Sequence, residues 1–248
     1  MSAPLFIWLG SGRARRRAVG PPARQLDQAA QAGLPVPAGA VLLDEFFRLA
    51  LDTGLAQANG RTVAIPDPEL WHNTLFHSVR LPRFRRPVAV YAVAVATTGD
   101  ETAAGAPPVA CRDVDFANPP AAARALEAVW SAAPPGDTAR RDALIIEMVP
   151  AQVTGAATTT DADDDWVAPA GAAPFALPQL RGRRGPDADR PPYVRRLQQL
   201  LRGVRRTFGS GAWRIEWADD GHICWLVLVS AVLSPTIQPT LSVPGANS

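Results

Sequence analysis

Lysine is absent from the sequence, because all 25 basic residues among its 248 are arginine. A chain without lysine amines supplies no Schiff base, no P-loop lysine and no lysine general base of its own. Cysteine and histidine are also scarce, with 2 and 3 residues. Their spacing matches neither a disulfide framework nor a metal site, so we expect reduced thiols and ordinary histidines.

Long hydrophobic runs are missing as well. The apolar run at residues 223–233 covers 11 residues, whereas a helix that crosses a bilayer needs about 20. The run at residues 5–9 is too short for the core of a secretion signal, and its arginines follow it instead of preceding it. We therefore expect a cytoplasmic protein with no membrane span.

Positive charge is in small excess. The 23 acidic residues leave a formal net charge of +2, so nucleic acid is not the expected partner. The arginines form two runs with few aromatic residues for stacking on bases. One interpretation is that these runs are simply solvated. The other is that they contact an acidic surface of another protein subunit. The candidate partner-binding residues are Arg13, Arg15, Arg16, Arg17, Arg83, Arg85 and Arg86.

Hydrophobic periodicity and the placement of proline and glycine predict both helices and strands. Asp-Gly within the turn 219–221 is a strong signal for a hairpin between the last two strands. The strands on either side of Pro150 are candidates for a second hairpin. We expect helices at 25–32, 44–55, 121–132 and 193–208, a short helix capped by Asp67, and strands at 38–43, 87–96, 144–149, 152–160, 213–217 and 223–232.

One domain is expected over residues 1–233, followed by an irregular tail at 234–248. Within it, residues 161–192 change from an acidic cluster to a stretch rich in proline and arginine, which is typical of a mobile loop. The acidic cluster lacks the spacing of a calcium-binding loop. It is either solvated or docked against the arginines at 181–184.

Four segments of the chain, taken in order, resemble the N-terminal ATP-grasp domain of phosphoenolpyruvate synthase and pyruvate phosphate dikinase. They are QLDQAAQAGLPVPAGAVLLDEFF (25–47), PVAVYAVAVATTGDETAAG (87–105), IIEMVPAQVTGAATTTD (145–161) and TFGSGAWRIEWADDGHICWLVLVSAV (207–232). The resemblance covers about half of the chain. It implies a reduced ATP-grasp-like domain, α/β or α+β in class, with mixed β-sheets and a closing C-terminal hairpin.

The resemblance also implies where nucleotide-binding groups would lie, and most of them are replaced. The Gly-Gly-Lys-Gly run falls on the residues GPPA at 20–23, so Pro22 stands at the lysine position and two amide donors are lost. Glu216 keeps its carboxylate, either as a vestigial cofactor-binding or metal-binding residue or as a structural one. The phosphate-binding arginine falls on Tyr91, the adenine-facing glutamine on Ile146, and the glutamine and arginine of the closing strand on Leu228 and Ser230.

A triphosphate with Mg²⁺ must be met by cations, backbone donors and carboxylate oxygens. We therefore expect no catalytic residue, no metal and no cofactor, and a catalytically inactive pseudoenzyme that serves as an interaction or assembly subunit. The alternative is an ATP-binding phosphotransferase subunit, using ATP and Mg²⁺, that a partner chain completes. The resemblance implies that full enzymes carry a phosphohistidine domain and a substrate barrel, and this sequence contains neither.

Overall fold

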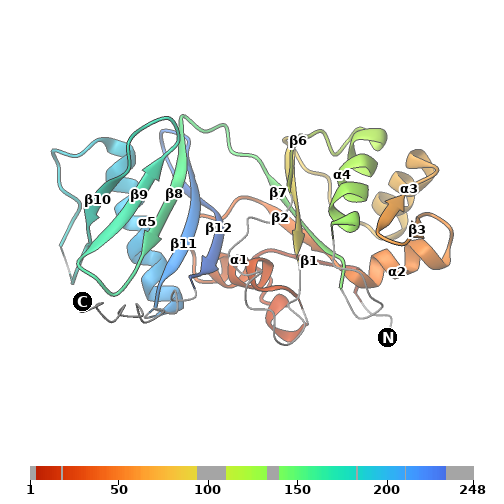
Figure 1. The fold of residues 1–248 in the computed structure, drawn as a ribbon, viewed down its shortest axis with the longest axis horizontal. Coiled ribbons are helices and arrows are strands. Elements are labelled where there is room, and N and C mark those ends of the chain that lie inside the picture. The colour runs from red at the N-terminus through yellow and green to blue at the C-terminus, as the bar shows by residue number, and fades with distance from the viewer. Residues whose placement is uncertain are drawn as a thin grey trace, which may run out of the picture.

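Two five-stranded sheets organise the chain, and they lie side by side along the long axis of the molecule (Figure 1). The structure is a computed structural model that describes residues 4–17, 19–93, 110–132, 140–182, 184–209 and 211–232. The first sheet has the order β1 (Phe6–Trp8), β2 (Gly39–Leu42), β7 (Asp142–Glu147), β5 (Val88–Val93) and β6 (Ala110–Val114). The second has the order β10 (Phe175–Pro178), β9 (Asp164–Pro169), β8 (Val153–Thr159), β11 (Trp213–Asp219) and β12 (Cys224–Ala231).

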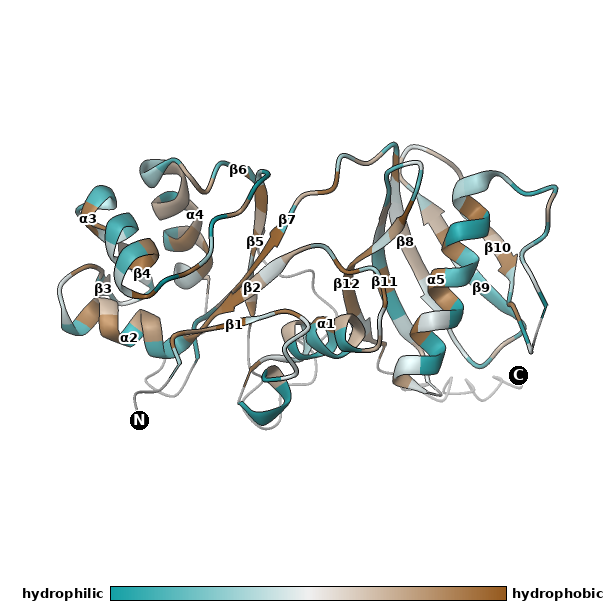
Figure 2. Ribbon diagram, turned by 180° about the vertical axis from the view of Figure 1, so that it is seen from behind, coloured by the Kyte–Doolittle hydropathy of each residue, from teal (hydrophilic) through white to brown (hydrophobic). Residues whose placement is uncertain are grey.

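An aromatic core supports the first sheet. The strands β2, β5 and β7 are hydrophobic along most of their length (Figure 2), as expected for strands that are covered on both faces. Phe46, Trp71 and Trp130 are almost completely buried, and the Phe46 ring lies against both indoles. They come from the helices α2 (Asp44–Asp52), α3 (Pro68–Asn73) and α4 (Pro119–Ser131), beside a turn of π-helix, η2 (Thr74–Ser78), and the small hairpin β3 (Gln57–Asn59) and β4 (Thr62–Ala64).

One long helix, α5 (Pro192–Phe208), covers one face of the second sheet (Figure 2). Its leucine and valine side chains are buried at helical spacing. A shorter helix, α1 (Pro21–Gln31), contacts β12 and α5 and contributes to the same core. The 3₁₀ turn η1 (Ala14–Arg16) precedes α1.

Two ion pairs fix α5 to the sheet beneath it. Asp219 accepts two hydrogen bonds at 2.7 Å from Arg196, and Asp165 accepts from Arg205 at 2.8 Å. Both carboxylates are about 1% exposed. A buried carboxylate that lost such a partner would be strongly destabilising, so these arginines hold the helix in one position on the sheet.

The predicted α/β or α+β class and the C-terminal hairpin are confirmed, but the sheets expected to be mixed are antiparallel at every described strand pair. In the turn of that hairpin, Asp220 accepts hydrogen bonds from the Trp225 indole and from the amides of Ile223 and His222, which lower the pKa of Asp220 to about 2. Among the described residues, no helix is both long enough and apolar enough to cross a membrane.

Two predictions about local structure are wrong. The strands on either side of Pro150 do not form a hairpin, because β7 belongs to the first sheet and β8 to the second. Residues 161–192 are not a loop throughout, because β9 and β10 lie within them and pair with each other. The expected tail at 234–248 lies outside the described residues, and the domain boundary at residue 233 stays a prediction.

Candidate functional site

A cleft of about 290 Å³ opens where the chain leaves the first sheet at β7 and enters the second sheet at β8. The segment between the two strands forms part of its wall, and residues of β5, β6, β7, β8, β11 and β12 supply the rest. Most of the described lining is apolar, with five polar side chains among it. The lining residues with chemical interest are Tyr91, Arg112, Ile146, Glu147 and Glu216.

The described lining of the cleft carries one cation and two carboxylates, and the cation is paired with one of them. Arg112 on β6 donates to the Glu216 carboxylate on β11 at 3.3 Å, so this ion pair bridges the two sheets. The Glu147 carboxylate accepts a hydrogen bond from the backbone amide of Arg85 at 2.6 Å. Arg112 is the one cationic side chain among the described lining residues. It is therefore engaged before any ligand enters.

Tyr91 forms a buried part of the cleft wall, with 2% of the residue exposed. Burial raises the pKa of its hydroxyl, the positive charge of Arg112 opposes this, and the negative charge of Glu216 adds to it. A neutral phenol therefore stands where the resemblance implies an arginine. A phenol provides one donor, whereas a guanidinium provides a charge and five.

The structure brings together three of the positions that the resemblance selected, since Tyr91, Ile146 and Glu216 all line the cleft. Leu228 does not line it, because that side chain packs into the core beneath the second sheet. Pro22 lies in the first turn of α1, which begins four residues earlier than expected. Glu147 and Arg112 were missed, because an isolated charged residue carries no sequence signal that distinguishes a cleft from open surface.

The donor set of the cleft does not fit a magnesium ion. A hard divalent cation requires several oxygen ligands that converge on one point. Of the two carboxylates in the cleft, Glu216 is paired with an arginine and Glu147 accepts from a backbone amide. Within the described part of the chain, no group of three histidine, cysteine or carboxylate side chains is arranged to hold a metal.

The histidine, cysteine and acidic residues discussed below take part in packing, burial or ion pairing within the fold. His72 contacts the Phe116 carbonyl at 3.2 Å and packs on Phe76. Burial raises the pKa of the Cys224 thiol far above its ordinary value. Part of the predicted docking of the acidic cluster is present, because Asp163 forms an ion pair with Arg181; Arg183 lies outside the described residues.

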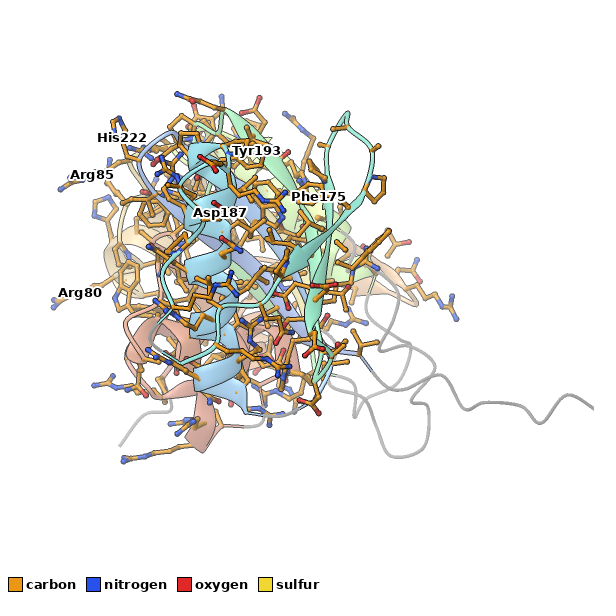
Figure 3. The ribbon with its side chains drawn as sticks, turned by 90° about the vertical axis from the view of Figure 1, so that its left-hand side faces the viewer. Arg80, Arg85, Phe175, Asp187, Tyr193 and His222 are labelled. Carbon is orange, nitrogen blue, oxygen red and sulfur yellow. The ribbon has the colours of Figure 1, made fainter. Side chains whose placement is uncertain are left out.

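The arginine side chains of the two runs are exposed and are not among the described lining residues of the cleft. Arg83 stacks over the Phe76 ring at 5.8 Å, and Arg85 points away from the body of the protein (Figure 3); Arg86 is exposed next to it. Arg13, Arg15, Arg16 and Arg17 surround η1 and are exposed. Their role in binding a partner stays a prediction.

A second depression lies beside the first of these runs. It has a volume of about 500 Å³ and is formed by η1, the end of α1 and the end of α5. We call it the arginine groove, because two arginines from different segments face it. Its lining residues are Arg15, Gln28, Gln31, Ala32, Arg206 and Thr207.

No protein-family model and no curated protein matches this sequence. Similar solved structures include the L-amino acid ligase of Bacillus licheniformis, with 12% identity, a TM-score of 0.42 and coverage of 85% of this chain and 40% of that one. The D-alanine–D-alanine ligase of Bacillus anthracis shows 10% identity and a TM-score of 0.45, covering 90% of this chain and 58% of that one. An ATP-grasp RimK domain protein of Sphaerobacter thermophilus shows 16% identity and a TM-score of 0.38, covering 84% and 59%. The chain thus spans 40% to 59% of the length of these proteins, and the likeness assigns it no activity.

Proposed function

We propose that this chain is a catalytically inactive relative of the ATP-grasp domain of phosphoenolpyruvate synthase and pyruvate phosphate dikinase, and that it serves as an interaction or assembly subunit. One observation carries the proposal. The single described cation of the cleft, Arg112, is already paired with Glu216, the one carboxylate that the resemblance retains. Bound polyphosphate would have to break this pair and would then meet one guanidinium.

The size and lining of the cleft support the same conclusion. Pockets for drug-sized ligands range from about 300 to 1,000 Å³, and this cleft of about 290 Å³ lies at the lower limit. Tyr91 occupies the position that the resemblance gives to a phosphate-binding arginine, and its phenol, whose pKa burial raises further above 10.0, carries no positive charge. Phosphoryl transfer depends on positioning and charge stabilisation by cations, and these groups supply little of either.

Thermal unfolding tests the proposal directly. ATP with Mg²⁺ should leave the melting temperature unchanged at millimolar concentration. A ligand present at about 100 times its dissociation constant would stabilise the native state by about 2.7 kcal/mol. For a chain of this size that corresponds to a rise of several degrees, and such a rise would refute the proposal. Arg112→Gln is the matched control, because it removes the one described cation of the cleft, and a rise that disappeared in this variant would place the nucleotide there.

The second candidate is an ATP-binding phosphotransferase subunit that a partner chain completes. It is favoured by the presence of an open cleft whose wall carries two carboxylates, Glu147 and Glu216, and one arginine. A partner would have to supply the lysine and the phosphorylated histidine that this sequence lacks. Transfer of the γ-phosphate of ATP to protein in the mixture of both chains, and in neither alone, would favour this candidate.

A further inference from the structure

The arginine groove is lined by hydrogen-bond donors of the kind that bind oxyanions. Two guanidinium groups, Arg15 and Arg206, and two carboxamides, Gln28 and Gln31, face it, and no carboxylate occurs among its described lining residues. Arginine forks match the geometry of carboxylate and phosphate oxygens and recognise them in pairs.

The wall that carries Arg15 is held by a buried carboxylate. Asp27, on the inner side of α1, is completely buried and accepts hydrogen bonds at 3.0 Å from the amides of Gly12 and Ala14. Ala14 is completely buried next to them. The backbone of η1 is therefore fixed to α1, and Arg15 projects from an anchored segment.

Close packing between segments shapes the rest of the groove. The φ angle of Gly12 is +69°, which favours glycine, and the end of the Gln31 side chain lies directly against this residue. Gln28 donates to the Thr207 carbonyl at 3.0 Å, which joins α1 to the end of α5. The groove thus exists before a ligand binds, which lowers the entropic cost of binding.

The positive charge of the groove is not compensated locally. Helix α5 has five arginines and no acidic residue. Two of them, Arg196 and Arg205, are paired with buried aspartates, whereas Arg206 and Arg15 have no ion pair within the described part of the chain. Asp161, which accepts from the amide of Gly211 beyond the end of α5, is not among the lining residues.

Three exposed neighbours, Arg13, Arg16 and Arg24, add to the positive surface around the groove. Arg17 has a different surrounding. Burial raises the pKa of Glu45, but the hydrogen bond from Arg140 and the charges of Arg140 and Arg17 lower it. Arg17 is not among the described lining residues of the groove.

We infer that the arginine groove binds an acidic segment of a partner protein, with aspartate or glutamate carboxylates on Arg15 and Arg206. This inference deepens the proposed function and rests on it, since it gives the interaction subunit a surface and a partner chemistry. The carboxamides of Gln28 and Gln31 contain both donors and acceptors, as a peptide group does. Nucleic acid fits less well, because the described lining residues of the groove include no aromatic side chain to stack on a base.

Fluorescence anisotropy with a labelled peptide of about ten glutamate residues at low salt measures this binding. The wild-type chain should bind, and the double variant Arg15→Gln/Arg206→Gln should bind at least about tenfold more weakly, a difference of about 1.4 kcal/mol. The matched control is Arg61→Gln/Arg124→Gln, which removes the same charge from two exposed arginines near the first sheet. The control should lose less than about twofold, since it changes the long-range field alone.

The inference is overturned if the wild-type chain does not bind the peptide, or if the two double variants lose affinity equally. It is also overturned if a single-stranded oligonucleotide of equal charge binds as tightly as the peptide. The single variants Arg15→Gln and Arg206→Gln, each with an intermediate loss, provide the test if the double variant has a lowered melting temperature. Failure of the proposed function is separate, because it would be observed as stabilisation by ATP with Mg²⁺ whatever the peptide does.

Discussion

The cleft and the arginine groove use charge in opposite ways. In the cleft, Arg112 and Glu216 neutralise each other across the two sheets, and Tyr91 is a buried neutral phenol. In the groove, Arg15 and Arg206 face a depression whose described lining has no acid. The difference shows that the unpaired positive charge of the two sites is located at the ends of α1 and α5 and not between the sheets, where a polyphosphate would need it.

The same contrast occurs within α5. Arg205 points at the sheet and pairs with buried Asp165, whereas the next residue, Arg206, points at the groove. Both are arginines of one helix turn, but the first stabilises the fold and the second is available for binding. Orientation on the helix, and not residue type, separates the two roles.

The largest effect on stability is expected from breaking the buried ion pair between Asp165 and Arg205. Asp165→Ala leaves the guanidinium of Arg205 without its carboxylate, so the free energy of unfolding should fall by about 3 to 5 kcal/mol. Urea denaturation measures it. Asp163→Ala is the control, because the pair of Asp163 with Arg181 is exposed and such pairs contribute about 0 to 1 kcal/mol. Equal losses in the two variants would contradict the distinction between paired and available arginines.

A smaller effect is expected from the carboxylate that anchors η1. Asp27→Asn replaces one of two acceptors with a donor, so unfolding should become easier by about 1 to 3 kcal/mol. The variant also removes a negative charge near the groove, which by itself would strengthen binding of an acidic peptide. We expect weaker peptide binding instead, because Arg15 loses its anchor. Stronger binding in the anisotropy assay would show that the position of η1 does not matter.

The smallest effect is expected in the pH dependence of the free energy of unfolding that results from ionisation of Tyr91. Because its pKa is raised above the ordinary value of 10.0 in the folded state, the unfolded chain ionises first. The free energy of unfolding should therefore be unaffected by this group below about pH 10 and should fall above it, by at most about 1.4 kcal/mol per pH unit. Tyr91→Phe should remove this part of the slope in denaturation curves from pH 9 to 11.

Tyr193→Phe is the control, since no other tyrosine is present in the sequence. An unchanged slope in Tyr91→Phe would mean that the cleft wall is hydrated at this position.

Elements with a local signal were predictable from the sequence. The spacing of Val194, Leu197, Leu201 and Val204 predicts one buried face of a helix, and all four side chains are buried in α5. Asp67 caps α3 by accepting from the Leu70 amide at 3.0 Å, as its position before Pro68 indicates. Such features depend on residues within one or two turns of each other.

Strands β9 and β10 were missed for a physical reason. Asp165 is buried and Trp166 is 56% exposed, the reverse of what their chemistry favours. The carboxylate is tolerated inside because Arg205, 40 residues later, and Gln179 supply its hydrogen bonds. An acidic run is normally solvated, so the sequence favoured a loop.

The candidate site was predictable in part. The resemblance selected Tyr91, Ile146 and Glu216, which the fold brings into one cleft. Arg112 was not predictable, because its pairing with Glu216 joins residues 104 positions apart on different sheets. The proposed inactivity does not depend on that pair alone, but the pair is what engages the one described cation of the cleft.

By itself, the sequence determined the helices, the closing hairpin and the absence of lysine, since each follows from residue types or from spacing along a few turns. Tertiary structure alone decided that β7 and β8 separate into two sheets, and which arginines meet a carboxylate. The reason is that an ion's partner and a strand's neighbour come from distant parts of the chain, and burial sets whether a charge must be paired.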